Sequence, residues 1–327
     1  MPDIFSIIFI IALVFSANLV TRLQPRYRQI FYWLLRLVNV PLFLIGLFFV
    51  MAPPDQIALF ATQNGAPLTN PMAYGIILEM LAIWGILITL RSFRLFLSKP
   101  MPLDPDSPVH ALALFLVGFL VGNVFMIMTQ GGVAELVETA VSTSILDIVW
   151  PQLLFVLLAI LGVGWRVRRS WREMLARLGL TRPTTGHLWL ALRWIVILVL
   201  LQWTVGVIWA AVDPAQAEAL GGINELLYAD FNTVGEWLIL ALAAGIGEEI
   251  LFRGALQPVL GLPVTAVLFA LGHVQYGFTP ITVLILIIGI VLGLIRRRTN
   301  TTTAMIVHMG YNFVLGLLAL LAAFLAQ

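Results

Sequence analysis

The chain has 327 residues, of which 61% are hydrophobic, 10% are charged and none is cysteine. An ordinary soluble domain has about 25% charged residues, so the composition excludes a soluble globular protein and indicates an integral membrane protein. The lack of cysteine excludes disulfides, thiolate zinc sites and a cysteine nucleophile. The formal net charge is only +2 and the basic residues are scattered among loops, so the sequence does not predict binding of nucleic acid.

Apolar runs recur along the chain, each long enough to cross a hydrocarbon core of about 30 Å as a helix. The first run follows "MPD", with an acid where a secretory signal has positive charge, so we interpret it as a retained helix. The sequence therefore predicts an all-α polytopic membrane protein with about ten transmembrane helices. Their expected ranges are 4–21, 30–52, 72–90, 110–130, 145–165, 187–211, 233–258, 262–276, 280–295 and 302–326.

Positive charge falls in alternate loops between these helices. Four loops, at 22–28, 91–99, 166–182 and 296–298, hold 15 of the 18 basic residues, whereas the long loops between them hold none. Basic loops stay on the cytoplasmic side of a membrane. We therefore expect a bacterial plasma membrane protein with these loops in the cytoplasm and both termini outside. Part of the loop at 166–187 combines basic and apolar residues at helical spacing, so we expect it in the membrane interface, with a solvated linker as the alternative.

The stretch "AGIGEEILFRGAL", residues 244–256, places three charges inside apolar sequence. Charges at membrane depth cost several kcal/mol unless they are paired or solvated, so each one is a functional candidate. Glu249 and Arg253 are four residues apart on one helix face and can neutralise each other. Glu248 points away from that pair and needs another partner or water. Membership in a purely structural cluster is the alternative interpretation of Glu248.

Two of the four histidines lie on the helices that follow. His273 comes four residues after Phe269 on the helix expected at 262–276, and His308 comes four residues before Asn312 on the last helix. Helix rise places Glu248 and His273 about 17 Å, and His308 about 9 Å, from the cytoplasmic ends of their helices. These side chains can therefore meet in the cytoplasmic half of the membrane. A packing role is the alternative for each histidine.

A carboxylate and a histidine that face one water molecule can remove its proton and make a hydrolytic nucleophile. A second histidine and an asparagine can donate hydrogen bonds to the negative oxygen of a tetrahedral intermediate. Peptide hydrolysis is the reaction that needs both. Glu248, His273 and His308 also match the ligand count of a catalytic zinc ion, although the H-E-x-x-H motif is absent. The cofactor is therefore left open between zinc and none.

Three motifs indicate a family. E-E-x-x-x-R, F-x-x-x-H and H-x-x-x-N/D occur in this order as "EEILFR" at 248–253, "FALGH" at 269–273 and "HMGYN" at 308–312. In these motifs the chain resembles the CPBP intramembrane proteases, which include the CAAX prenyl endopeptidases and the bacterial Abi proteins. Members are described both as metalloproteases and as glutamate proteases. The resemblance implies water activation by Glu248 with His273, an oxyanion site at His308 and Asn312, and structural support from Glu249, Arg253 and Phe269.

The resemblance covers residues 233–320 and leaves the first four helices out. We therefore divide the chain into a variable N-terminal transmembrane module of about four helices at 1–140 and a CPBP-type protease domain at 141–327. The expected function is an intramembrane endopeptidase that hydrolyses a peptide bond of a membrane-associated protein or peptide, with CAAX-type processing as one form. Its expected partners are this substrate and the lipid bilayer. The alternatives are a non-catalytic bacteriocin-immunity or scaffold protein and a secondary transporter.

Overall fold

The computed structural model describes residues 4–64, 68–132 and 143–325, and these residues form helices joined by turns and loops. This part of the chain contains no β-strand, only an isolated bridge between Trp165 and Arg169. The expected all-α fold is confirmed. Within the described residues, seven helices are long and apolar enough to cross a membrane. They are α2 (Pro25–Met51), α4 (Pro71–Thr89), α6 (Pro108–Thr129), α8 (Ile145–Gly162), α10 (Thr185–Val212), α15 (Pro280–Arg298) and α16 (Thr301–Leu325).

The other three predicted segments also form helices, but shorter or composite ones. The first is α1 (Ile4–Val20). The segment at 233–258 is α12 (Val234–Glu248), continued by the π-helix η1 (Glu249–Leu256) and by α13 (Gln257–Leu260). The third, α14 (Leu262–Leu271), has 10 residues, which reach about 15 Å, well short of a hydrocarbon core of about 30 Å.

Within the described residues, four further helices lie in segments that we expected to be loops. Two of them begin at Pro54 and Pro214, a residue favoured at the first helical position. Asp213 caps the second of these, because its side chain accepts a hydrogen bond from the backbone nitrogen of Gln216. The four helices are α3 (Pro54–Asn64), α5 (Arg91–Leu97), α9 (Trp171–Leu178) and α11 (Pro214–Leu227).

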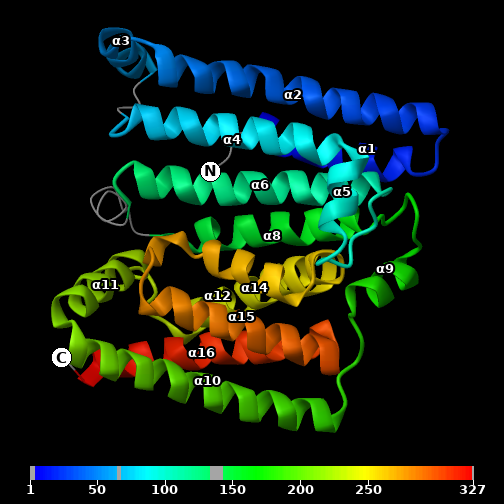
Figure 1. Ribbon diagram of the computed structural model, residues 1–327. Coiled ribbons are helices and arrows are strands. Elements are labelled where there is room, and N and C mark those ends of the chain that lie inside the picture. Colours follow the sequence, from blue (N-terminus) through cyan, green and yellow to red (C-terminus); the bar gives the residue numbers. More distant parts are fainter. Residues whose placement is uncertain (1–3, 65–67, 133–142, 326–327) are drawn as a thin grey trace. The chain divides into compact units, whose positions relative to one another are not determined.

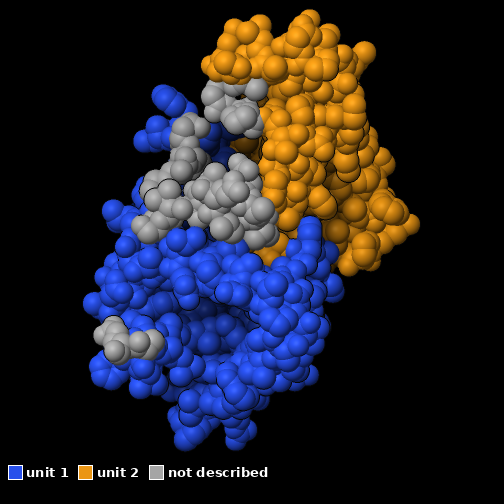
Figure 2. All heavy atoms as spheres, turned by 90° about the vertical axis from the view of Figure 1, so that its left-hand side faces the viewer, with its two compact units in different colours: residues 1–12, 139–270, 278–327 blue, residues 13–138, 271–277 orange. Residues whose placement is uncertain are grey.

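The chain falls into two compact units, shown in different colours in Figure 2. Unit 1 comprises Met1–Ala12, Thr139–Ala270 and Phe278–Gln327, and unit 2 comprises Leu13–Glu138 and Leu271–Gly277. The boundary predicted between residues 140 and 141 lies outside the described residues. The division into a protease domain and a variable module therefore stays a prediction.

Unit 2 consists mainly of α2, α4 and α6, in which α4 packs against both other helices (Figure 1). Glycines let two of these backbones touch. A Cβ atom on Gly46 of α2 would lie 2.8 Å from the carbonyl oxygen of Gly75 on α4. Small residues at such contacts allow the close helix packing that is common in membrane proteins.

Unit 1 is built around α12 and η1. The helix α12 packs between α8 and α16, and α16 also contacts α10 and α15 (Figure 1). The π-helix η1 contacts α8, α9, α15 and α16. The segment with the three predicted charges therefore lies in the interior of unit 1, where elements from distant parts of the sequence meet.

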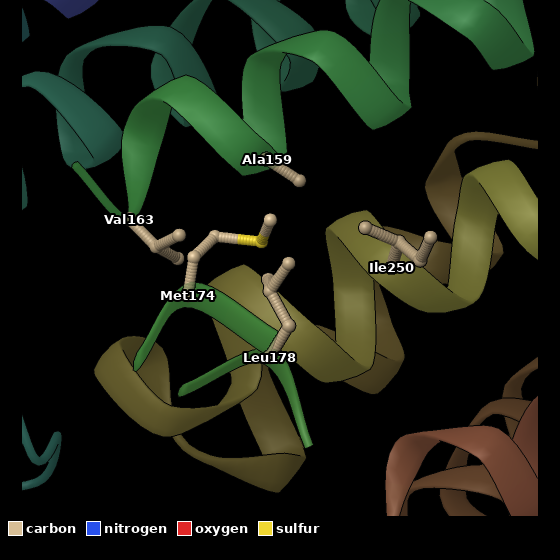
Figure 3. Packing of buried hydrophobic residues seen from close by; sticks show 5 residues of the cluster. All are labelled: Ala159, Val163, Met174, Leu178 and Ile250. Atoms are coloured by element: carbon tan, nitrogen blue, oxygen red, sulfur yellow. The ribbon is translucent and has the colours of Figure 1, made fainter. Parts of the chain in front are cut away.

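The amphipathic helix α9 packs its apolar face on η1. Met174 and Leu178 of α9 are fully buried and point toward Ile250 of η1 and toward Ala159 of α8 (Figure 3). Ser170 and Glu173 form a capping box at the start of α9, and Gly179 ends the helix with φ of 71°. The helical spacing recognised in this loop thus corresponds to a real helix, while its location in the membrane interface stays a prediction.

Candidate active site

The first motif begins at Glu248, the last residue of α12, and continues through Arg253 in the π-helix η1. A π-helix contains more residues per turn than an α-helix, and such segments are rare and often occur at functional sites. Two arginines from other elements bind its backbone. Arg296 Nε of α15 donates to the carbonyl oxygen of Arg253 at 3.1 Å, and Arg177 Nη1 of α9 donates to that of Gly254 at 2.9 Å. These contacts tie the end of η1 to α9 and α15.

Glu249 and Arg253 form a buried ion pair, as their spacing predicted. Their side chains are 0% and 1% exposed, and Arg253 Nη1 lies 3.0 Å from Glu249 Oε1. Arg253 Nη1 has ion-pair distance but not hydrogen-bond geometry, while its Nη2 donates to the carbonyl oxygen of Gly289 at 3.3 Å. Since an isolated charge would be costly here, this pairing explains how both groups are tolerated inside unit 1.

His308 joins this pair from α16. Its Nδ1 lies 3.0 Å from Glu249 Oε1, so one carboxylate oxygen contacts both the guanidinium and the imidazole. Phe269 of α14 covers the cluster: the Arg253 Cζ atom is 4.1 Å from the centre of the Phe269 ring, and the His308 ring centre is 5.8 Å from it. The cluster therefore brings together one residue from each of the three motifs around Glu249.

Glu248 faces a different neighbour, as the helix geometry predicted. Gln152 Nε2 of α8 donates to Glu248 Oε1 at 3.3 Å. The second oxygen, Glu248 Oε2, is buried and makes no hydrogen bond within the described residues. The two adjacent glutamates thus differ in their partners: Glu249 Oε1 contacts Arg253 and His308, whereas Glu248 Oε1 accepts from the neutral amide of Gln152. The second oxygen of each carboxylate is buried and makes no hydrogen bond within the described residues.

The prediction that the helix expected at 262–276 extends to His273 is wrong. The helix α14 ends at Leu271, and His273 lies in the turn before the short 3-10 helix η2 (Val274–Tyr276). Gly277 follows η2 with φ of 58°, a conformation that favours glycine. His273 is counted with unit 2, so its pairing with Glu248 stays a prediction.

Asn312 follows His308 by one turn on α16, as expected, and is half-buried. The preceding Tyr311 is buried, and its hydroxyl donates a hydrogen bond to Gln202 Oε1 of α10. His308 and Asn312 therefore lie on one face of a helix that is fixed against α10 beside them. Their roles in an oxyanion site stay predictions.

Gln152 is the site residue that the sequence analysis missed. It stands within "DIVWPQLLFVLL", where it is the amide in an otherwise apolar part of α8. An uncharged polar residue inside an apolar run was the available signal, but periodicity does not say which helix it faces. Its contact with Glu248 spans 96 positions of sequence.

No three His, Cys, Asp or Glu side chains among the described residues are grouped so that they could hold a metal ion. Of the expected ligands, Glu248 contacts Gln152, whereas His308 contacts Glu249 through Nδ1. The described geometry thus gives zinc no preformed three-ligand site. Zinc stays an alternative.

All three motifs fall in a segment that matches a known family. Residues 230–314 match the family described as type II CAAX prenyl endopeptidase Rce1-like. No curated protein and no solved structure matches the chain. With its long apolar helices, the chain is an integral membrane protein. The match over residues 230–314 confirms, for this segment, the resemblance to the CPBP proteases that the three motifs indicate.

Proposed function

We propose that the protein is an intramembrane endopeptidase that hydrolyses a peptide bond of a membrane-associated protein or peptide, with CAAX-type processing as one form. The observation that carries the proposal is the different environment of the two adjacent glutamates. Glu249 is neutralised by Arg253 and contacts His308, so it supports the site. Glu248 Oε1 accepts only from the neutral amide of Gln152, and its Oε2 makes no hydrogen bond in the described part of the chain. We therefore assign the role of general base to Glu248 and not to the ion-paired Glu249.

In the proposed reaction, Glu248 Oε2 accepts a proton from a water molecule, and His273 orients that water. The water oxygen forms a bond to the carbonyl carbon of the substrate, and the electron pair of the carbonyl moves onto its oxygen. The proton then passes from Glu248 to the amide nitrogen as the C–N bond breaks. The products are a carboxylic acid and an amine, and the Glu248 carboxylate is regenerated.

His308 and Asn312 bind the negative oxygen of the intermediate. Because His308 Nδ1 faces the Glu249 carboxylate, its N–H points to Glu249 and its Nε2 faces away. Nε2 donates to an oxyanion only when the imidazole carries both protons. The Asn312 amide donates without any change of protonation. Glu249 thus supports the oxyanion site through His308.

We place the basic loops in the cytoplasm of a bacterial cell and the termini outside. Arg177 and Arg296, which bind the backbone of η1, both belong to these basic segments. Peptide cleavage would then occur in the cytoplasmic half of the bilayer. The substrate is therefore a protein or peptide whose scissile bond enters the membrane from that side.

The test is cleavage of membrane-anchored reporter peptides by purified wild-type protein, by Glu248→Gln and by the matched control Glu218→Gln. Glu218 is exposed on α11, so its change should leave cleavage intact. We expect Glu248→Gln to abolish cleavage. Cleavage that survives in Glu248→Gln would refute the proposal and favour an immunity or scaffold protein, while solute transport that is lost in this variant would favour a transporter. Zinc measured in the same samples separates the metal and glutamate mechanisms.

A further inference from the structure

The helices α8 and α12 pack against each other, and their backbones approach closely beside Glu248. A Cβ atom on Gly247 would lie 2.7 Å from Cβ and 2.9 Å from Cα of Gln152. Real Cβ atoms do not approach other atoms so closely, so only glycine fits at position 247 without a shift of α8. Because Gly247 has no side chain, Gln152 can pack next to Glu248, the proposed catalytic glutamate.

The amide of Gln152 meets the carboxylate of Glu248 with its donor atom. Gln152 Nε2 lies 3.3 Å from Glu248 Oε1, whereas Gln152 Oε1 and Glu248 Oε2 are buried and make no hydrogen bond within the described part of the chain. The reverse orientation would place an amide oxygen against a carboxylate oxygen. Only the observed orientation gives an ionised Glu248 a hydrogen-bond donor.

A carboxylate without a partner rotates easily, because its terminal torsion is broad and nearly two-fold. Glu249 is fixed by Arg253 and His308, whereas Glu248 is held by the amide of Gln152 on α8. A single donor on Oε1 makes the two oxygens of Glu248 inequivalent and leaves Oε2 to face the reacting water. Such fixed geometry matters in catalysis, where small misplacements lower the rate strongly.

We propose that Gln152 is a positioning residue for the hydrolytic reaction: its amide holds Glu248 Oε1, so that Oε2 is the atom that accepts the proton of the water. This inference rests on the proposed function and extends it to a residue outside the three motifs. The competing explanation is that Gln152 only fills space between α8 and α12.

The test uses Gln152→Met, which keeps the length of the side chain and removes the donor. We expect kcat for reporter cleavage to fall about 10- to 100-fold, the loss typical of a hydrogen bond to a charged group, with little change in KM. Gln216→Met is the matched control, because Gln216 of α11 contacts Trp209, and we expect it to retain the wild-type kcat. An unchanged kcat in Gln152→Met, or an equal fall in both variants, would overturn the positioning role.

A second measurement does not depend on activity. Melting temperatures are compared for wild type, Gln152→Met, Glu248→Gln and the double variant. If the amide holds the carboxylate, Gln152→Met lowers the melting temperature by about 2–6 °C in the wild-type background and by less when Glu248 is already neutral. Equal shifts in both backgrounds would refute the contact. Coupled shifts in a protein that cleaves no reporter would refute the proposed function, and with it the catalytic role of Gln152, while leaving the contact itself supported.

Discussion

Glu249 and His308 are 59 positions apart in the sequence, yet Oε1 of the first lies 3.0 Å from Nδ1 of the second in the interior of unit 1. The same oxygen contacts Arg253 Nη1, also at 3.0 Å. Glu249 of the first motif therefore connects that motif to His308 of the third. The adjacent Glu248 contacts Gln152 instead. This difference in partners is the basis on which we propose charge balance for Glu249 and water activation for Glu248.

Replacing Arg253 by Met tests the buried ion pair. The change would leave the Glu249 carboxylate buried without its cation, and breaking one side of such a pair typically costs about 3–5 kcal/mol of unfolding free energy. We expect a clear fall in melting temperature in detergent. The exposed Arg172→Met is the control and should change it little. Because Glu249→Gln removes the uncompensated charge, the double variant Glu249→Gln/Arg253→Met should recover part of the loss, and no recovery would argue against the pairing.

Replacing Asn312 by Ala tests the oxyanion site. Loss of one oxyanion donor typically lowers kcat by about 10²–10³-fold, and because the bond forms in the transition state, KM should stay nearly constant. Steady-state cleavage of a reporter peptide measures both quantities. The exposed Asn232→Ala provides the comparison. A rise in KM without a fall in kcat would instead show that Asn312 binds the substrate in its ground state.

The sequence predicted the helices well where a long apolar run decides the structure. The apolar runs of α2, α10 and α16 are long enough to cross a bilayer. In a bilayer, a single segment can satisfy all its backbone hydrogen bonds only as a helix. The run around "LFALGHVQYG" was ambiguous, because spacing of four residues between Phe269 and His273 suits a helix. Gly272 and Gly277 were the opposing signal, and α14 indeed ends at Leu271. Local glycine chemistry outweighed the apolar pattern there.

The sequence predicted the contacts of the candidate site only where they lie within one helix. Spacing of four residues indicated the Glu249–Arg253 pair, and the structure contains it. Spacing could not indicate that His308 contacts Glu249 or that Gln152 contacts Glu248, since both contacts depend on how separate helices pack. The π-helix at 249–256 was not predictable from the spacing of its residues either. Arg177 and Arg296, which bind its backbone, come from distant parts of the chain.

The contact between Arg177 and η1 can be tested through activity. Burial, together with the neighbouring cations of Arg169 and Arg296, lowers the pKa of Arg177 to about 10, so this side chain is still a cation at neutral pH. It donates to the Gly254 carbonyl oxygen at 2.9 Å. We expect Arg177→Met to loosen the end of η1 and to lower both kcat and the melting temperature. The exposed Arg182→Met serves as control, and wild-type values for Arg177→Met would show that α9 does not support the site.

Replacing Gly254 by Ala tests how closely α9 approaches η1. A Cβ atom at this position would lie 3.1 Å from both Cδ2 and the carbonyl oxygen of Leu178. Leu178 cannot retreat freely, because it is fully buried and its carbonyl oxygen accepts a hydrogen bond from Thr301 Oγ1 at 2.6 Å. Overpacking of this kind typically costs about 1–3 kcal/mol, so the melting temperature should fall.

The control for this change has the opposite expected sign. A Cβ atom on Gly222, inside α11, would meet no atom within 4 Å. In an open helix interior, alanine is more favourable than glycine by about 0.5–1 kcal/mol, so Gly222→Ala should leave the melting temperature unchanged or raise it. If Gly254→Ala changes the melting temperature no more than Gly222→Ala does, α9 does not pack closely on η1. A fall confined to Gly254→Ala supports it, because the helix preference of alanine is common to both variants.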